Sequence, residues 1–146
     1  MEYIYDYITR REYECPHCNA LPPDIKPNYL PIFYEIFFDK WKQLREEWGR
    51  AIRIGPPGGG GGYRCAYYNR MIGGTYLSAH LFGGALDPDL NTVDEVDKFA
   101  ELVEQMFPEL RMGIYTKTGT FVHIDQAFLI RPRSSESWIE GVRWKK

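Results

Sequence analysis

The 146-residue sequence predicts one α+β domain over residues 1–146, in which a small antiparallel sheet is flanked by helices. Three observations favour this fold class. Apolar residues recur at helical intervals in two stretches, two strand-like runs are joined by a turn, and neither an internal repeat nor a shift of composition marks a domain boundary. Hydrophobic residues make up 44% and charged residues 26% of the chain, which is typical of globular proteins and gives no indication of disorder.

The two long helices are predicted from apolar spacing and from capping signals. Residues 32–50 predict an amphipathic helix of about five turns, because apolar residues follow one another in steps of three and four. These residues are Phe33, Phe37, Trp41, Leu44 and Trp48. A second helix begins after Thr92, in a Thr-Val-Asp-Glu capping box, and Pro108 ends it. Thr9 opens a similar box before a short helical turn, and residues 63–71 predict another short helix.

The strands are predicted from short apolar runs bounded by turn residues. They are residues 51–54, 85–87, 111–116 and 120–125. Residues 117–119 join the last two as a hairpin, and Pro88 ends the second strand. The tail, with Trp138 and Trp144, is predicted to be irregular. Residues 58–62 are five consecutive glycines, which predict a mobile loop but lack the lysine of a phosphate-binding loop.

Charge and hydropathy limit the classes of partner. A net charge of −2 without a basic block gives no indication of a nucleic-acid partner. No apolar run reaches the roughly 18 residues of a membrane span. The N-terminus has neither the basic nor the apolar region of a signal peptide, so we expect synthesis in the cytoplasm. Release by cell lysis or packaging in a phage particle remains open, and the oligomeric state is unknown.

Two of the three histidines lie near aspartates, and this arrangement predicts a metal site. His80 and Asp87 are separated by a double glycine, and His123 precedes Asp125 by two positions. In a strand, His123 and Asp125 would point to the same face, about 6–7 Å apart. Two imidazoles and one carboxylate suit a zinc ion, and three protein ligands leave a fourth position open, as in catalytic zinc sites. From the residues alone, core histidines and a turn at Asp87 remain alternatives.

Four blocks of sequence resemble one enzyme family. Residues 78–87 fit Ser-x-His-x-x-Gly-x-Ala-x-Asp at every defined position. Residues 9–15 resemble Phe-Thr-x-x-Glu-Phe-x-Cys, residues 62–69 resemble Gly-Tyr-Arg-Cys-Pro-x-Tyr-Asn, and residues 113–125 resemble Gly-x-Tyr…Phe-Val-His-Val-Asp. In this order the blocks are similar to those of the zinc D-alanyl-D-alanine carboxypeptidases and the related endopeptidases of phage lysins. These enzymes share a metal-site fold with the Hedgehog signalling domain.

The resemblance implies a Hedgehog/D,D-peptidase-like fold and a zinc ion held by His80, Asp87 and His123. Arg64 matches the family arginine that faces the substrate, where a guanidinium could hold an oxyanion or a substrate carboxylate. The implied activity is hydrolysis of peptidoglycan stem peptides by water that zinc has made more acidic. The missing signal peptide favours a phage or prophage origin.

Two further residues are implied to bind substrate. Ser78 matches the motif serine, which either hydrogen-bonds the substrate or orients the loop that carries His80. Tyr115 matches the tyrosine of the closing block and is assigned to the substrate side of the site.

The general base is the point at which this sequence departs from the family. Relatives place Glu or Asp three positions before the last ligand, or His two positions before it, and here these positions hold Thr120 and Phe121. Asp125 is the nearest carboxylate on the correct face and is our candidate base. The alternative role for Asp125 is to support His123 or an arginine by hydrogen bonding. The missing base also keeps open a second function, a non-catalytic zinc-stabilised binding or structural module such as a phage particle component.

The cysteines form a separate question. Cys15-Pro16-His17-Cys18 is also the active-site sequence of oxidising disulfide oxidoreductases, but their fold needs a strand before the motif and a βαβ frame around it. A structural zinc on Cys15, Cys18 and Cys65 is a second reading, although a second Cys-x-x-Cys is missing. The sequence favours a third interpretation, in which the cysteines are a buried or loosely paired set of thiols.

Overall fold

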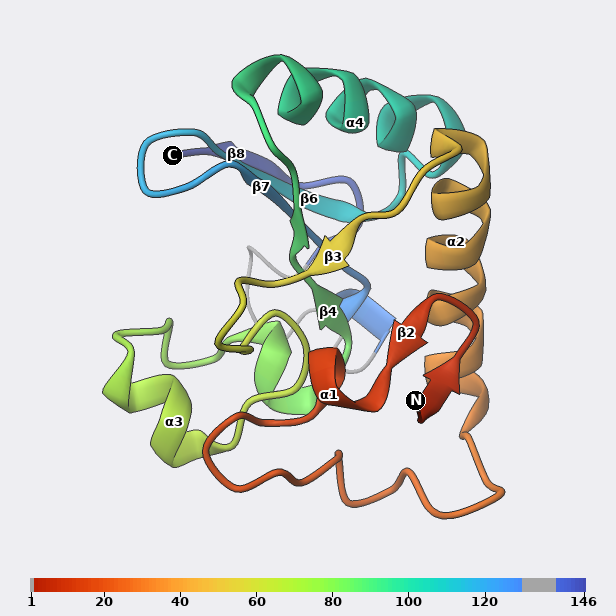
Figure 1. The fold of residues 1–146 in the computed structure, drawn as a ribbon, viewed down its shortest axis with the longest axis vertical. Coiled ribbons are helices and arrows are strands. Elements are labelled where there is room, and N and C mark those ends of the chain that lie inside the picture. Colours follow the sequence, from red (N-terminus) through yellow and green to blue (C-terminus); the bar gives the residue numbers. More distant parts are fainter. Residues whose placement is uncertain (1, 130–138) are drawn as a thin grey trace.

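A computed structural model describes residues 2–129 and 139–146 and has the mixed α+β composition that the sequence predicts. Two long helices, α2 (Ile32–Trp48) and α4 (Val93–Met106), pack against each other, and α4 also packs on strands β6 (Arg111–Tyr115) and β7 (Phe121–Asp125). Figure 1 shows α4 along the top and α2 down the right of the molecule, with the strands between these helices and α3 (Ala66–Met71). In the described part of the chain, every helix is too short or too polar to cross a membrane.

Helix α2 confirms the helix predicted over residues 32–50, except that it ends two residues earlier. Gly49 takes a left-handed conformation with φ of 82°, a conformation that costs glycine little and that ends the helix. The apolar face of the helix is buried in the core, where Trp41 is fully buried and Trp48 partly so. The Trp41 Nε1 donates a hydrogen bond of 3.2 Å to the Tyr7 carbonyl, which satisfies the indole inside the core.

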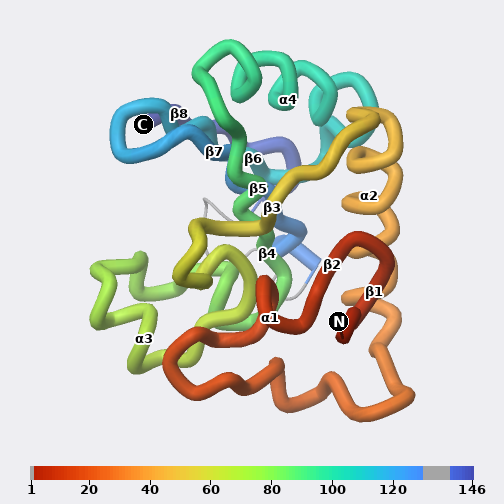
Figure 2. The backbone as a smooth tube through the Cα atoms, viewed as in Figure 1, coloured from red at the N-terminus to blue at the C-terminus, as the bar shows by residue number. Residues whose placement is uncertain are grey.

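Both capping boxes predicted from the sequence begin helices. Helix α1 (Arg10–Tyr13) has the complete box, in which Thr9 and Glu12 satisfy each other's backbone N–H groups. At α4, the Thr92 side chain accepts from the Glu95 N–H at 3.1 Å, but the Glu95 carboxylate bonds the backbone N–H of Asn91 instead of Thr92. Two short antiparallel strands precede α1 and were not predicted: β1 (Tyr3–Tyr5) and β2 (Ile8–Thr9). Figure 2 shows this N-terminal pair beside α2.

Six strands form the main sheet. In addition to β6 and β7 they are β3 (Arg53–Ile54), β4 (Ala85–Leu86), β5 (Pro88–Asp89) and β8 (Arg143–Lys145). The order is β3-β5-β7-β6-β8, and β4 also pairs with β7. The β6–β7 hairpin is the one that the sequence predicts, with Arg111 opposite Asp125 and Gly113 opposite His123.

Two predictions about the sheet are wrong. The tail is not irregular around Trp144, because β8 adds to the edge of β6 in the parallel direction, so the sheet is mixed and not purely antiparallel. Trp138 lies outside the described residues. Pro88 does not end the pairing either: β4 and β5 pair with β7 in one register, and Pro88 is the first residue of β5, opposite Ile54. The first position of a strand tolerates a missing N–H.

The run of five glycines forms no helix or strand, as predicted, but the prediction of a loose loop is wrong for its second half. Residues 60–62 are buried, and the carbonyl of Gly61 accepts a hydrogen bond of 2.9 Å from the backbone N–H of Asp87. A Cβ at Gly61 would collide with the backbone of Gly55. The second half of this loop therefore contacts Asp87, which the sequence predicts as a metal ligand.

Candidate metal centre

The structure brings the three predicted ligands together from three separate elements. His80 lies on the 3-10 helix η1 (Ala79–Phe82), Asp87 is the residue between β4 and β5, and His123 lies in the middle of β7. The potential ligand atoms of the three residues all lie within 4.8 Å of one another, and all three residues are buried. The side chain of Ser78 accepts a hydrogen bond of 3.2 Å from the His80 N–H, and Gly83 ends the turn at φ of 73°.

Asp87 lies between the two imidazoles. Its Oδ2 is 3.2 Å from His80 Nε2, and its Oδ1 is 2.9 Å from His123 Nδ1. The two rings are 5.1 Å apart at an interplanar angle of 72°. One nitrogen of each imidazole and both carboxylate oxygens therefore converge on one point.

The other nitrogen of each imidazole is held by an acceptor. His80 Nδ1 lies 2.6 Å from the carbonyl oxygen of Gly62, so this nitrogen carries the proton and Nε2 presents its lone pair to Asp87. His123 Nε2 donates to Asp125 Oδ2 at 2.6 Å, and Nδ1 lies 2.9 Å from Asp87 Oδ1, where the protonated ring donates a second hydrogen bond and a neutral ring would present the lone pair that binds a metal. Metal-binding histidines are typically fixed in this way, by a carbonyl or carboxylate on the nitrogen that does not bind the metal.

The pKa shifts of the cluster favour an ionised Asp87 between a protonated His123 and a neutral His80. Burial lowers the pKa of His80, which favours the neutral ring. Burial acts to raise the pKa of Asp87, but the two imidazoles outweigh it and hold the pKa well below its usual range. Burial acts to lower the pKa of His123, but hydrogen bonds and charge from Asp125 and Asp87 raise it to about 9. A neutral His80 Nε2 and an ionised Asp87 thus face each other as two acceptors, and this donor set fits zinc.

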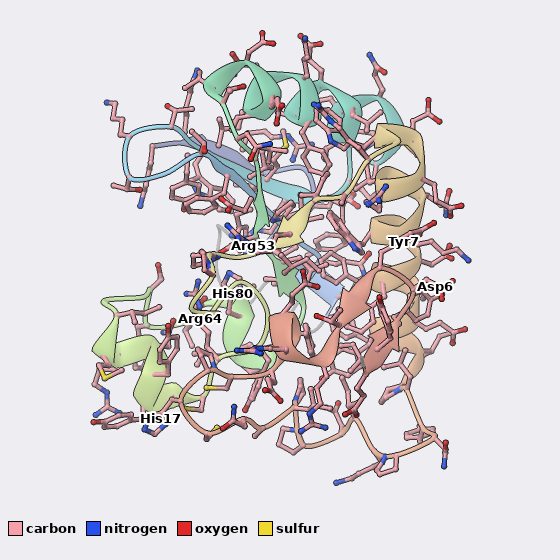
Figure 3. All side chains as sticks on the ribbon, viewed as in Figure 1. Asp6, Tyr7, His17, Arg53, Arg64 and His80 are labelled. Atoms are coloured by element: carbon pink, nitrogen blue, oxygen red, sulfur yellow. The ribbon has the colours of Figure 1, made fainter. Side chains whose placement is uncertain are left out.

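The remaining predicted site residues line the same cleft, which has a volume of about 540 Å³. Arg64 Nη2 is 3.3 Å from Asp87 Oδ2, and Arg64 Nε donates a hydrogen bond of 2.8 Å to the carbonyl of Gly60. Tyr115 stacks on Phe121 with ring centroids 4.4 Å apart. Figure 3 shows Arg64 and His80 beside each other, on the side of the molecule toward α3. A cleft of this size suits a small peptide.

Asp125 is fully buried at the back of the cleft, and both of its oxygens are engaged. Oδ2 contacts His123 Nε2, and Oδ1 accepts a hydrogen bond of 3.0 Å from the backbone N–H of Ala127. The guanidinium of Arg111 is also near, with its Nε 3.7 Å from Oδ1. The shared face predicted for His123 and Asp125 is confirmed, and Asp125 lies at the opposite edge of the imidazole ring from Asp87.

Sequence reasoning missed three contributors to the site. The hairpin register could have identified Arg111, because counting outward from residues 117–119 places it opposite Asp125. No local pattern indicates Trp144, which reaches the cleft through the long-range pairing of β8. Its ring packs at a tilt of 47° on His123, with centroids 5.3 Å apart, and its Nε1 donates to the Tyr115 hydroxyl. The sequence also does not indicate the Gly62 carbonyl, because its hydrogen bond to His80 depends on how the glycine loop packs.

Gly62→Ala is expected to destabilise the protein by about 1–3 kcal/mol and to weaken zinc binding. A Cβ at Gly62 would lie 2.7 Å from the Tyr13 backbone, so the chain must shift and take with it the carbonyl that holds His80. Urea unfolding and competition with a zinc chelator measure the two effects. Gly58→Ala is the matched control, because no atom lies within 4 Å of a Cβ there. Equal stability and zinc affinity in the two variants would contradict the role of this close contact.

Comparison with known proteins identifies a family for this chain. No curated protein matches the chain, but the family model for peptidase M15 matches residues 27–125. This segment covers more than half of the chain and includes the candidate ligands His80, Asp87 and His123, together with Arg64. The cleft geometry and the family match agree on the same chemistry, and the chain belongs to the peptidase M15 family of zinc metallopeptidases.

Proposed function

We propose that this protein hydrolyses peptide bonds in peptidoglycan stem peptides that contain D-amino acids, as a D-alanyl-D-alanine carboxypeptidase or as a peptidoglycan endopeptidase. The observation that carries the proposal is the buried cluster of His80, Asp87 and His123, whose free ligand atoms converge beside Arg64 in a peptide-sized cleft. The substrate class rests on the four sequence blocks, and a Hedgehog-like arrangement of the metal site is part of the same proposal. Release by lysis or a place in a phage particle would bring the protein to this substrate.

The three ligands would hold one zinc ion. When bound there, zinc would supply Lewis acidity, which polarises a carbonyl group and lowers the pKa of water. Gly62 and Asp125 keep the two imidazoles in the tautomers that such binding needs. The burial of all three ligands keeps competing water away from the cluster and strengthens its electrostatic interactions.

Arg64 would bind negative charge on the substrate. Its guanidinium is fixed by the Gly60 carbonyl and by Asp87, and its own backbone N–H donates to the His80 carbonyl at 3.1 Å. A cation held rigidly beside the reacting carbonyl can stabilise a developing oxyanion, or it can bind the terminal carboxylate of a carboxypeptidase substrate. The Ser78 hydroxyl caps the His80 turn, and among the described residues its proton has no acceptor; the stacked ring of Tyr115 forms a wall of the cleft.

Asp125 was our candidate base, and its surroundings favour the supporting role instead. A base must reach the water that attacks the substrate, but Asp125 contacts the far nitrogen of His123 and is fully buried. We therefore assign Asp125 as a positioning residue that fixes the His123 ring.

One observation favours the alternative function, a zinc-stabilised module without catalysis. The two positions where relatives have a base are occupied by side chains with structural contacts. The Thr120 hydroxyl donates a hydrogen bond of 2.6 Å to the Leu90 carbonyl, and Phe121 stacks on Tyr115. Neither side chain can accept a proton at neutral pH.

Digestion of purified peptidoglycan tests the proposal. The zinc-loaded protein is expected to cut the stem peptides, and mass spectrometry of the muropeptides that a muramidase then releases identifies the bond that is cut. Release of free D-alanine indicates a carboxypeptidase, whereas cleaved cross-links indicate an endopeptidase. A chelator should stop the cleavage and added zinc should restore it. Unchanged stem peptides after prolonged digestion, with a protein that holds zinc in the cleft, would favour the non-catalytic module.

A further inference from the structure

A second cluster of metal-ligand side chains lies outside the cleft. The sulfur atoms of Cys15, Cys18 and Cys65 all lie within 4.8 Å of one another, although Cys65 is 47 positions or more away in the sequence. None of the three lines the cleft that contains His80. Cys15 is buried, Cys65 is partly buried and Cys18 is exposed, so the cluster extends from the core to the surface.

A fourth ligand type is next to the cluster. His17 Nδ1 lies 3.8 Å from Cys65 Sγ, and the His17 ring packs 4.6 Å from the ring of Tyr67 on α3. Figure 3 shows His17 beside α3 and well apart from His80. Three thiolates and one imidazole are the donor set of a closed, four-coordinate structural zinc site. Cys65 thus supplies a third thiolate where a second Cys-x-x-Cys is missing, and the His17 ring, which is close to Cys65 but not to all three sulfur atoms, would turn toward them to act as the fourth ligand.

The backbone around the sulfur atoms suits negatively charged thiolates. Cys15 Sγ accepts from the Cys65 N–H and Cys65 Sγ accepts from the Tyr68 N–H, both at 3.4 Å. The turn is closed by hydrogen bonds of its own, from the Asn19 N–H to the Cys15 carbonyl at 2.7 Å and from the Cys15 N–H to the Ala20 carbonyl.

The surroundings do not suit a disulfide oxidoreductase. That chemistry needs the first cysteine exposed at the start of a helix, within a βαβ frame. Here Cys15 is fully buried, the Cys-Pro-His-Cys segment follows α1 as a loop, and β1, β2 and α1 precede it.

We propose that Cys15, Cys18 and Cys65, with His17 as the fourth ligand, form a second zinc site with a structural role. The site would link the loop after α1 to the start of α3, where Cys65 is the N-cap residue. Arg64 and Gly62 lie immediately before Cys65, and the Tyr63 N–H donates to the Tyr13 carbonyl at 2.7 Å in the same segment. A metal bound there would hold the segment that presents Arg64 to the cleft and the Gly62 carbonyl to His80. Its binding free energy would add to folding stability.

Metal analysis of four proteins tests the proposal, with the full chain purified under reducing conditions. We expect about two zinc ions per chain in the parent, one in His80→Ala, one in Cys18→Ser and none in the double variant. Cys18 is the best cysteine to replace because it is exposed and its side chain does not fill the core. A His80→Ala protein without zinc, or zinc in the double variant, would overturn the second site. Because these readouts do not use peptidase activity, they remain informative if the proposed function fails.

A second measurement does not depend on the folding of cysteine variants. Cobalt(II) added to metal-free His80→Ala should give the intense near-ultraviolet absorption of thiolate–cobalt bonds, and an organomercurial that modifies the three thiols should abolish it. Absence of that absorption would refute the site. Fewer than three reactive thiols in the unfolded, unreduced protein would show a disulfide in place of the metal and would also refute it.

Discussion

Replacing His80 by alanine is expected to remove the cleft zinc and to reduce hydrolysis of the stem peptides to background, a loss of about 10⁶-fold or more given the usual acceleration by enzymes. His80 is one of only three ligands, and its Nε2 has no substitute among the described residues that line the cleft. Elemental analysis gives the metal content, and chromatography of digested peptidoglycan gives the activity. Both are measured on the same preparation, so the loss of activity can be assigned to the loss of metal.

A pair of aspartate variants provides the matched control for this experiment. Asp87→Asn removes the carboxylate that lies between the two imidazoles and should also lose the cleft zinc. Asp89→Asn lies two positions along the chain, where the carboxylate pairs with Arg53 at 2.6 Å outside the cleft, and it should keep both zinc and activity. Equal hydrolysis of the stem peptides by the parent and His80→Ala would refute the enzymatic proposal. Retention of the cleft zinc in Asp87→Asn would remove Asp87 from the ligand set.

The parts of the fold and site that could be predicted are those with a local signal. A helical period and a capping box each depend only on residues within one helix. The period of residues 32–50 corresponds to α2, and the capping boxes at Thr9 and Thr92 precede α1 and α4. The proximity of His80 and Asp87 could be predicted because both lie in one motif of ten consecutive residues, 78–87. Alternation in a hairpin strand was enough to place His123 and Asp125 on one face.

The parts that could not be predicted depend on contacts between distant segments. Strand β8 forms by adding to an edge of β6, which the sequence of the tail does not indicate, and Trp144 enters the cleft with it. The glycine run is packed because the backbones of Gly55 and Gly61 approach closely, and composition alone suggests only freedom of motion. The cysteines were left as loosely paired thiols because Cys65 is far from Cys15 in the sequence, and only the fold brings them together.

Asp125→Asn is expected to weaken zinc binding about 10–100-fold while leaving the rate at saturating zinc within about tenfold of the parent. The carboxylate accepts from two donors at once, the His123 Nε2 and the Ala127 backbone N–H. An asparagine has a single acceptor oxygen, so one donor must lose its partner or face the amide N–H₂ group. The His123 ring is then less firmly held in the tautomer that directs Nδ1 toward Asp87. Chelator competition measures the affinity, and Asp97→Asn on the exposed face of α4 is the matched control.

The same variant separates the two roles of Asp125 because affinity and rate respond differently. A positioning residue acts through the imidazole, so excess zinc should restore most of the activity. A general base acts on the proton of the attacking water, so its loss leaves the affinity intact and lowers the rate by about 10²–10⁴-fold at any zinc concentration. That second pattern would return Asp125 to the catalytic machinery, despite its position on the far edge of His123 and its complete burial. The first pattern would mean that the proton is accepted by a group other than the carboxylate beside His123.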